Sequence, residues 1–207
     1  MGSKYHHGDL PNALRCAARE VIDERGLGNF SLREVARRAG VSHTAPAHHF
    51  GDMQGLLTSL ATEGFEYLHQ ALSEAIEGID DPIDRLNALG VAYIRLGRDH
   101  KAHTEVMFRT DLVDADDVDL QTAGLHAYGM LYDCLTSLFE AEDLDVDIDD
   151  ATALCWSAMQ GLIVLEPKFE RMCDLRSTPM PPIEEMVGKF TDFMVNGFRG
   201  HRKPATS

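Results

Sequence analysis

The chain has 207 residues, of which 44% are apolar and 26% charged, with a formal net charge of −15. This composition is ordinary for a globular protein that is long enough to bury a core. No run approaches the roughly 18 apolar residues of a membrane helix, and the N-terminus lacks the apolar core of a signal peptide, so we expect a cytoplasmic protein. The four cysteines are far apart and exclude a small disulfide scaffold, so free buried thiols are expected rather than redox or metal sites.

The charge is unevenly distributed along the chain. Residues 1–55 carry seven Lys/Arg against six Asp/Glu, a balance of +1, whereas the remainder carries 12 against 28, a balance of −16. This contrast is typical of an N-terminal head that meets phosphates and an acidic body that phosphates repel. An acidic body that only keeps the protein soluble would look the same, so the contrast between the two parts is the informative observation.

The first predicted helix spans residues 9–25. Apolar residues recur there at helical spacing, and Pro11 lies in the first turn, where its missing N–H costs nothing. The following stretch, SLREVARRAGVSHTAPAHHF, predicts two short helices over residues 31–38 and 42–48. Two short helices joined by a tight glycine turn describe a helix-turn-helix, whose second helix lies in the major groove of DNA.

The ends of these two short helices carry recognisable signals. Ser31 and Glu34 fit a capping box, in which each side chain binds a backbone N–H of the first turn. Gly40 can end the first helix in a left-handed conformation, and Ser42 can cap the second. Three basic residues of the first helix are expected on its solvent side: Arg33, Arg37 and Arg38.

The rest of the chain is also predicted to be helical. Further helices are expected over residues 52–79, 82–98, 101–110, 118–142, 149–171 and 182–199. No strand-like alternation of any length appears, so we predict an all-α protein of about nine helices. Residues 1–55 would form a three-helix DNA-binding domain, and residues 56–207 a helical domain for effector binding and dimerisation.

The last two predicted helices are the candidates for self-association. Each carries an apolar stripe, with Leu154, Leu162 and Leu165 on one helix and Val187 and Phe190 on the other. Two such helices from each subunit would form an intermolecular four-helix bundle. Packing of the same stripes inside a monomer is the alternative.

Residues 9–57 resemble the N-terminal domain of the TetR family of bacterial transcriptional regulators. The resemblance rests on the order and spacing of several signals: the apolar first helix ending at Gly26, then Ser31 to Ala36, Ala39 to Ser42, His49-Phe50 and Leu56-Leu57. It implies a dimer that binds operator DNA with its N-terminal helices, dimerises through its last two helices, and responds to a small organic molecule. The resemblance implies no cofactor.

The chain departs from the family pattern at two positions. Ala47 stands where a Tyr is common, and Met53 where a Lys is common, and both usual residues hold phosphates. Either the affinity for DNA is modest, or other residues carry more of the phosphate binding: Lys4, Ser31, Arg33 and Gln54. Lys4 belongs to a polar N-terminal arm that could follow the DNA or have no function.

The second short helix is expected to contact base edges. The candidate residues of this helix and its start are Ser42, His43, Thr44, Ala45, Ala47 and His48. Imidazole and hydroxyl groups can bind purine acceptors, and Ala45 or the Thr44 methyl can touch a thymine methyl. None of these residues is the bidentate Arg, Asn or Gln that discriminates sharply between bases, so the operator sequence does not follow.

A second set of residues in the body mixes bulky apolar groups with a few hydrogen-bonding ones, as small-molecule pockets do. The candidate effector-binding residues are His103, Met107, Phe108, His126, Met130, Trp156 and Gln160. Plain core packing is the alternative for each of them. The segment from Trp156 to Gly161 resembles a Trp/His-Gly segment of one TetR subgroup, with Gln160 in place of His, which suggests an uncharged or weakly polar effector.

No metal site or catalytic motif emerges. His100, His103 and Glu105 could share a helix face, but a structural histidine pair is the simpler interpretation. No nucleophile, base and orienting group occur at a recognisable spacing. We therefore expect a dimeric repressor that an effector releases from DNA by tilting the long helix that follows residue 52. The alternatives are a helical small-molecule-binding protein or enzyme without sequence-specific DNA binding, and an activator or nucleoid-type binder.

Overall fold

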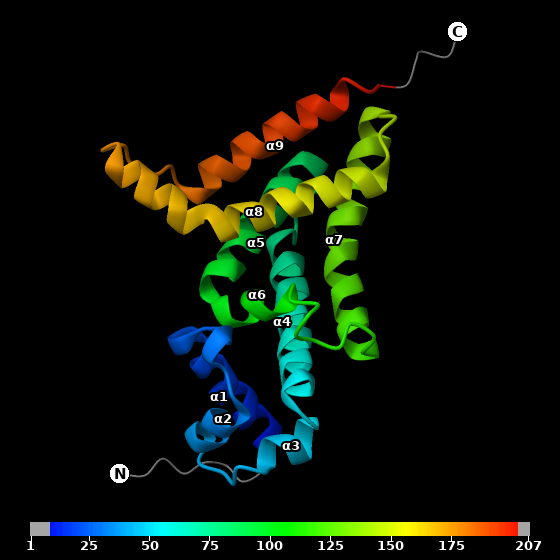
Figure 1. The fold of residues 1–207 in the computed structure, drawn as a ribbon. Coiled ribbons are helices and arrows are strands. Elements are labelled where there is room, and N and C mark those ends of the chain that lie inside the picture. The colour runs from blue at the N-terminus through cyan, green and yellow to red at the C-terminus, as the bar shows by residue number, and fades with distance from the viewer. Residues whose placement is uncertain (1–8, 203–207) are drawn as a thin grey trace. The chain divides into compact units, whose positions relative to one another are not determined.

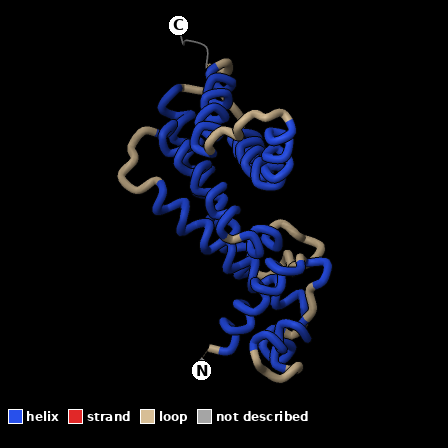
Figure 2. Tube along the Cα trace, turned by 90° about the vertical axis from the view of Figure 1, so that its left-hand side faces the viewer, coloured by secondary structure: helices blue, strands red, loops and turns tan. Residues whose placement is uncertain are grey.

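A computed structural model describes residues 9–202, and within them the chain forms nine α-helices and one short 3-10 turn (Figure 1). The helices are α1 (Leu10–Arg25), α2 (Leu32–Ala39), α3 (Ala45–Phe50), α4 (Met53–Ala75), α5 (Pro82–Asp99), α6 (Lys101–Met107), α7 (Val118–Glu142), α8 (Ile148–Leu175) and α9 (Ile183–Arg199). Among these residues the only β pairing is an isolated bridge between Leu144 and Arg202, and Figure 2 shows helices and loops throughout. The prediction of an all-helical chain with about nine helices is confirmed.

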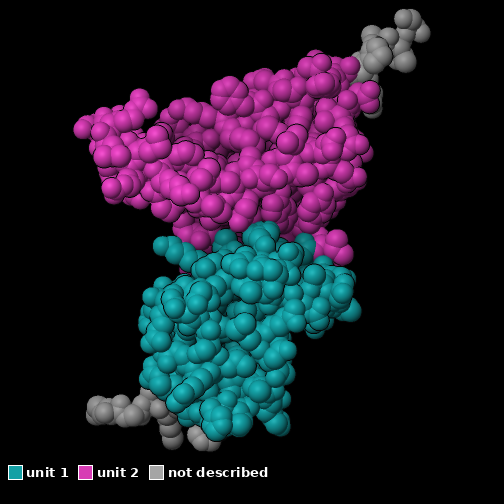
Figure 3. All heavy atoms as spheres, in the orientation of Figure 1, with its two compact units in different colours: residues 1–66, 100–124 teal, residues 67–99, 125–207 magenta. Residues whose placement is uncertain are grey.

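The chain divides into two compact units (Figure 3). Unit 1 comprises residues 1–66 and 100–124, and unit 2 comprises residues 67–99 and 125–207. Two long helices, α4 and α7, contribute residues to both units.

The first helix of unit 1 has sequence-encoded ends. The Asp9 side chain caps α1 by accepting a hydrogen bond from the Asn12 N–H at 3.2 Å, and Pro11 occupies the first turn. Gly26 ends the helix with φ at 70°, a conformation that residues with a Cβ rarely adopt.

Unit 1 has two adjoining apolar clusters. The first joins α1, α2 and the start of α4 through Leu14, Ala17, Ala18, Val21, Val35, Ala39 and Leu56. The second joins α1, α4, α6, the loop before α7 and the start of α7 through Ile22, Leu57, Leu60, Ala61, Ala102, Val106, Val113 and Leu120. The helix-turn-helix therefore rests on a buried scaffold that includes residues more than sixty positions away in the sequence.

This packing explains why unit 1 does not end near residue 55, where the DNA-binding domain is predicted to end. Leu57, Leu60 and Ala61 of α4 are fully or almost fully buried in the same cluster as Ile22 of α1 and Val106 of α6. Compact units and functional domains need not coincide, and the boundary between the predicted domains stays a prediction.

In unit 2, α5 lies very close to α8 and α9. A Cβ built on Gly90 would come within 2.7 Å of Val187 Cγ1 on α9, and one on Gly97 within 2.5 Å of Ile163 Cδ1 on α8. Real Cβ atoms do not approach other atoms so closely, because interiors are close-packed. The two glycines of α5 therefore set how near the three helices lie.

Some helix ends differ from the predicted ones. The third helix starts at Ala45 rather than Ser42, because residues 42–44 form a turn in which the Ser42 and Thr44 hydroxyl oxygens lie 3.0 Å apart. Ser42 is therefore not the cap, since Thr44 occupies that position. The α4 helix ends at Ala75 instead of residue 79, and α8 continues through Pro167 to Leu175.

Candidate nucleic-acid interface and effector site

The helix-turn-helix begins with a well-formed cap. The Ser31 side chain accepts a hydrogen bond from the Glu34 N–H at 3.3 Å, and Gly40 ends α2 in the left-handed region with φ at 69° and ψ at 29°. The Val41 N–H then donates to the Ala36 carbonyl at 3.0 Å, which reverses the chain toward α3. Buried Pro46 anchors α3, whereas most side chains around it are exposed.

The structure places most predicted DNA-contacting residues on the surface of unit 1. The exposed ones are Ser31, Arg33, Ser42, His43, Thr44, Ala47, His48 and Gln54. Ala45 is half-buried, and Lys4 lies outside the described residues. The Gln54 amide donates to the Val113 carbonyl at 3.1 Å, so one of its two N–H groups is already engaged within unit 1.

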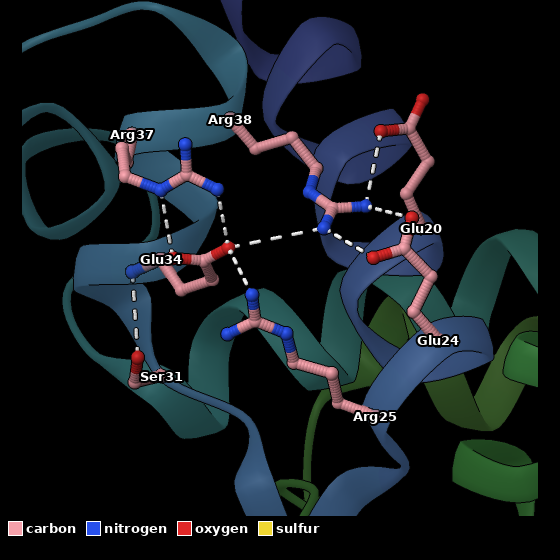
Figure 4. A network of polar contacts seen from close by, with 7 residues as sticks. All are labelled: Glu20, Glu24, Arg25, Ser31, Glu34, Arg37 and Arg38. Carbon is pink, nitrogen blue, oxygen red and sulfur yellow. Dashed lines mark hydrogen bonds and ion pairs between the residues drawn. The ribbon is translucent and has the colours of Figure 1, made fainter.

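A network of ion pairs surrounds Glu34 (Figure 4). Arg37 donates to both of its carboxylate oxygens, from Nε at 2.9 Å and from Nη2 at 2.7 Å. The Arg25 guanidinium, from the end of α1, lies 3.1 Å from Oε1 of the same carboxylate, and that of Arg38 lies 3.8 Å away. Hydrogen bonds from Arg37, with the nearby charges of Arg25 and Arg38, outweigh burial and lower the pKa of Glu34 to about 2.

Arg38 carries the network on to α1. Its guanidinium donates to both carboxylate oxygens of Glu24, at 2.7 and 2.5 Å, and lies 3.5 Å from Glu20. The Arg38 side chain is only 16% exposed, so the expectation that it faces solvent is wrong. Arg37 is 66% exposed but is also paired with a carboxylate, so for Arg37 the expectation is incomplete. Glu34 is likewise turned toward the arginines, so within the described residues only the Ser31 half of the expected capping box is formed.

An open groove of about 960 Å³ lies beside this network. It is lined by Arg25, Ser31, Arg33, Glu34, Ala36, Arg37, Val41 and His43. Of its three arginines, Arg33 alone has no carboxylate within ion-pair distance among residues 9–202. The groove thus joins the start of α2 to the turn before α3 and presents one uncommitted guanidinium.

Three of the predicted effector residues lie inside unit 1. His103 is 1% exposed, and its Nε2 is 2.8 Å from Oε2 of Glu63, whose Oε1 lies 3.4 Å from Nε of Arg15. The buried Met107 packs so closely on α4 that a Cβ on Gly64 would lie 2.7 Å from its sulfur. Phe108 meets the Phe65 ring edge-on, with centroids 5.8 Å apart. These three side chains tie α6 to α4.

The other four predicted effector residues belong to unit 2. The Trp156 ring contacts two tyrosine rings, with centroids 5.6 Å from Tyr93 and 5.8 Å from Tyr128. The Tyr93 hydroxyl donates to Oε1 of Gln160 at 2.7 Å, and burial raises the pKa of this hydroxyl. Gln160 is therefore held in place by a neutral partner.

Met130 and His126 make contacts that do not involve the Trp156 and tyrosine rings. The Met130 sulfur accepts a hydrogen bond from the Ser73 hydroxyl at 3.8 Å. His126 is exposed, and its ring centroid lies 5.7 Å from that of His69. Each of these contacts is formed within unit 2.

A small cavity of about 40 Å³ occurs in unit 2 beside Trp156. It is lined by Leu72, Leu86, Leu89, Gly90, Tyr93, Leu131, Cys155, Trp156, Met159, Val187, Phe190 and Thr191. No charged side chain lines it. Of the predicted effector residues only Trp156 takes part, while Gln160 is connected through Tyr93.

The lining residues on α5 were missed by sequence reasoning, although a signal was present. Leu86, Leu89, Gly90 and Tyr93 recur at spacings of three and four residues, which marks one face of a helix. That spacing shows a buried face but does not distinguish a packed core from a cavity.

Residues 9–202 contain no group of three or more His, Cys, Asp or Glu side chains arranged to hold a metal ion. Within the same range, every helix is too short or too polar to cross a membrane.

Comparisons with known proteins agree with the helix-turn-helix geometry. The family model described as "Bacterial regulatory proteins, tetR family" matches residues 14–60, and "Tetracyclin repressor-like, C-terminal domain" matches residues 86–174. The chain is similar to the HTH-type transcriptional regulator BetI of Stenotrophomonas maltophilia, with 34% identity over 71 residues, which cover 34% of this chain and 36% of that protein. The match thus spans about a third of the curated relative.

Solved structures resemble the chain over nearly its full length. A protein of unknown function from Rhodococcus sp. RHA1 is 28% identical, with 96% of this chain and 100% of that one covered and a TM-score of 0.78. The TetR family transcriptional regulator PfmR of Thermus thermophilus is 20% identical, covering 93% and 97% of the two chains with a TM-score of 0.68. The latter likeness shows a shared fold.

Proposed function

This chain belongs to the TetR family of bacterial regulatory proteins, and we propose that it is a homodimeric, cytoplasmic repressor of transcription that a small organic effector releases from operator DNA. The observation that carries the proposal is the surface from Ser42 to His48. Its side chains are mostly exposed around a short helix that Pro46 anchors and that the left-handed Gly40 turn joins to α2. An exposed second helix on a buried scaffold is the arrangement that enters a major groove.

The contacts to DNA divide into two classes. Arg33 and Ser31, at the start of α2, would hold phosphates, together with Lys4 and Gln54. His43, Thr44 and His48 would face base edges, with Ser42, Ala45 and Ala47 beside them. The absence of a usual Tyr at position 47 and a usual Lys at position 53 makes Arg33 the most important cation of the described head in this proposal.

The last two helices would form the dimer. Their exposed apolar side chains include Leu154, Val164, Leu165, Phe169, Met172, Leu175 and Phe193, of which Leu175 is 76% and Phe193 79% exposed. Large exposed apolar surfaces mark association sites. An isologous pair of α8–α9 faces would set two α3 helices about 34 Å apart, one turn of DNA.

The effector would act through a difference in affinity between two states of the dimer. The residues proposed to respond to it are His103, Met107, Phe108, His126, Met130, Trp156 and Gln160. Binding would tilt α4 and separate the heads, with a coupling of about 1–3 kcal/mol as is typical of allosteric proteins. The protein would bind the effector without converting it, and so would not be an enzyme.

Binding to DNA tests the proposal. Fluorescence anisotropy with DNA from upstream of the gene should show saturable, sequence-dependent binding by a dimer at low salt. Arg33→Ala should weaken binding to all sequences and lower the salt slope by about one unit, whereas Thr44→Ala should change the preference among sequences. Lys101→Ala, at the exposed first residue of α6 and outside the proposed dimer helices, is the control with the same loss of charge.

Three results would contradict the proposal. Equal affinity for unrelated DNA would indicate a nucleoid-type binder, and a reporter gene whose expression rises with the protein would indicate an activator. Failure to bind any DNA at low salt, combined with turnover of a metabolite, would favour a helical enzyme.

A further inference from the structure

Among the described residues, three threonines are buried: Thr58, Thr152 and Thr191. The first two donate their hydroxyls to the carbonyls four residues earlier, Thr58 to Gln54 at 2.8 Å and Thr152 to Ile148 at 2.7 Å. Thr191 is 3% exposed and makes no hydrogen bond within residues 9–202. The Thr191 hydroxyl oxygen is not among the fully buried unpaired side-chain atoms of these residues, so it keeps some accessible surface and is open to a partner from outside the chain.

Thr191 lines the small cavity of unit 2, which identifies where that partner would lie. A buried water is the simplest candidate, and about 40 Å³ exceeds the roughly 10–15 Å³ that one water needs. A buried water also needs two to four polar partners. The Tyr93 hydroxyl is already bonded to Gln160, and the other lining groups are almost all apolar, so the cavity is a poor water site.

The chemistry of the lining defines a class of ligand. No charged side chain lines the cavity, so a carboxylate or ammonium group would lose its hydration without gaining an opposite charge. Leucines, Val187 and Met159 favour an aliphatic body, and the small volume favours a slim one. Leu131, Trp156 and Phe190 are the half-buried lining residues, so they lie on the side nearest to solvent.

We propose that this cavity binds an uncharged molecule with a slim aliphatic body, whose single hydroxyl or carbonyl group pairs with the Thr191 hydroxyl. A threonine hydroxyl can both donate and accept, so it suits either group. The proposal rests on the proposed function, because it gives the chemical class of the effector and a position for it. The ligand would contact α5, α8 and α9, and so would touch both helices of the proposed dimer interface.

The chain supplies its own reporter, because Trp156 is its only tryptophan and lines the cavity. Its fluorescence is followed while four probes with the same carbon chain are titrated into the full-length protein: 1-butanol, 1-chlorobutane, butyrate and butylammonium. The two uncharged probes should cause a saturable change, and the two charged probes should cause none over the same concentration range.

Three substitutions isolate the hydrogen bond. Thr191→Val keeps the shape of the side chain and should weaken 1-butanol binding by about threefold to tenfold while leaving 1-chlorobutane within twofold. Thr152→Val is the matched control, because that buried threonine bonds its own helix and lies outside the cavity lining. Thr191→Ser retains the hydroxyl and should restore most of the 1-butanol affinity, which separates loss of the bond from loss of folding.

The inference fails if 1-butanol binds Thr191→Val as tightly as the unaltered protein, if butyrate saturates as readily as 1-butanol, or if 1-butanol gives no saturable change. Its failure is distinguishable from failure of the proposed function. Anisotropy without any probe tests DNA binding alone. If 1-butanol binds through Thr191 but leaves DNA affinity unchanged, the cavity stands as a ligand site and its effector role is wrong.

Discussion

Among the glycines of residues 9–55, Gly55 is the one whose replacement by alanine should destabilise the fold through a backbone clash. It is the third residue of α4, and its N–H donates to the Asp52 side chain at 2.9 Å. A Cβ built on Gly55 would lie 2.0 Å from the carbonyl oxygen of Phe50, the last residue of α3, and 3.1 Å from its carbonyl carbon. Because both atoms belong to the backbone, no side-chain rotation can relieve the clash, so Gly55→Ala must move the end of α3 away from α4.

The expected size of the effect follows from two opposing terms. Overpacking of this kind costs about 1–3 kcal/mol, and the upper end applies because the approach is more than 1 Å inside ordinary contact. Alanine in a helix gains about 1 kcal/mol over glycine, so the net loss is about 1–2 kcal/mol. For a protein of this size that corresponds to a Tm lower by roughly 2–8 °C.

Urea and thermal unfolding measure this loss, with Gly129→Ala as the control. Gly129 lies within α7 and a Cβ there meets no atom within 4 Å, so its replacement should stabilise the protein slightly. Anisotropy should also show weaker DNA binding by Gly55→Ala, since α3 would be displaced. If Gly55→Ala is as stable as Gly129→Ala and binds DNA normally, the close approach of α3 and α4 is wrong.

Two further predictions concern titratable groups. Burial raises the pKa of Glu63. The hydrogen bond with His103 and the charges of His103 and Arg15 together lower that pKa by more than burial raises it, so the pKa of Glu63 is below the ordinary value of 4.5. A carboxyl whose pKa is lowered by folding stabilises the fold at pH values above its unfolded pKa, and this contribution is lost as the pH falls through its folded pKa. Glu63→Gln should therefore lower the urea midpoint at pH 7 and make that midpoint depend less on pH below 4.5. Burial raises the pKa of the Cys134 thiol to about 11 and of the Cys155 thiol to about 12, so a thiol reagent at pH 8 should label the two half-buried cysteines first and these two only slowly. Four equally fast thiols in the native protein, or an unchanged acid dependence in Glu63→Gln, would contradict these assignments.

The sequence predicts helix ends well where proline, glycine or capping residues mark them. The starts of α5 and α7, at Pro82 and Val118, and the end of α9, at Arg199, agree with the prediction. Proline, glycine and capping residues act within a few positions, so their effect can be read from a short window. The start of α3 was misplaced because Ser42 and Thr44 pair with each other, which no capping rule anticipates.

The network around Glu34 was out of reach for a different reason. The capping box is a local rule, but Arg25 approaches Glu34 from a helix that ends before the turn, and Arg38 turns back to Glu24. Competition between a local bond and long-range charges depends on the tertiary fold. Sequence reasoning could therefore name the charged residues but not pair them.

The predicted effector residues show the same limit. Helical spacing identified buried faces on α6, α7 and α8, yet His103 proved to be bonded to Glu63, forty positions earlier, and the cavity is completed by Thr191. Spacing along one helix does not specify which other helix meets it. The cavity is built from five helices, so its lining follows only from the folded unit.

The paired guanidinium groups of the helix-turn-helix also affect how the protein would search a genome. Loose sliding along arbitrary sequence depends on free cations that exchange with the ion atmosphere of the double helix, and here Arg25, Arg37 and Arg38 are already matched with acids. With one uncommitted arginine in the groove and a charge of −16 on residues 56–207, the protein would dissociate quickly from non-specific DNA. Few copies would then be sequestered along the chromosome, and most would stay free to meet the operator.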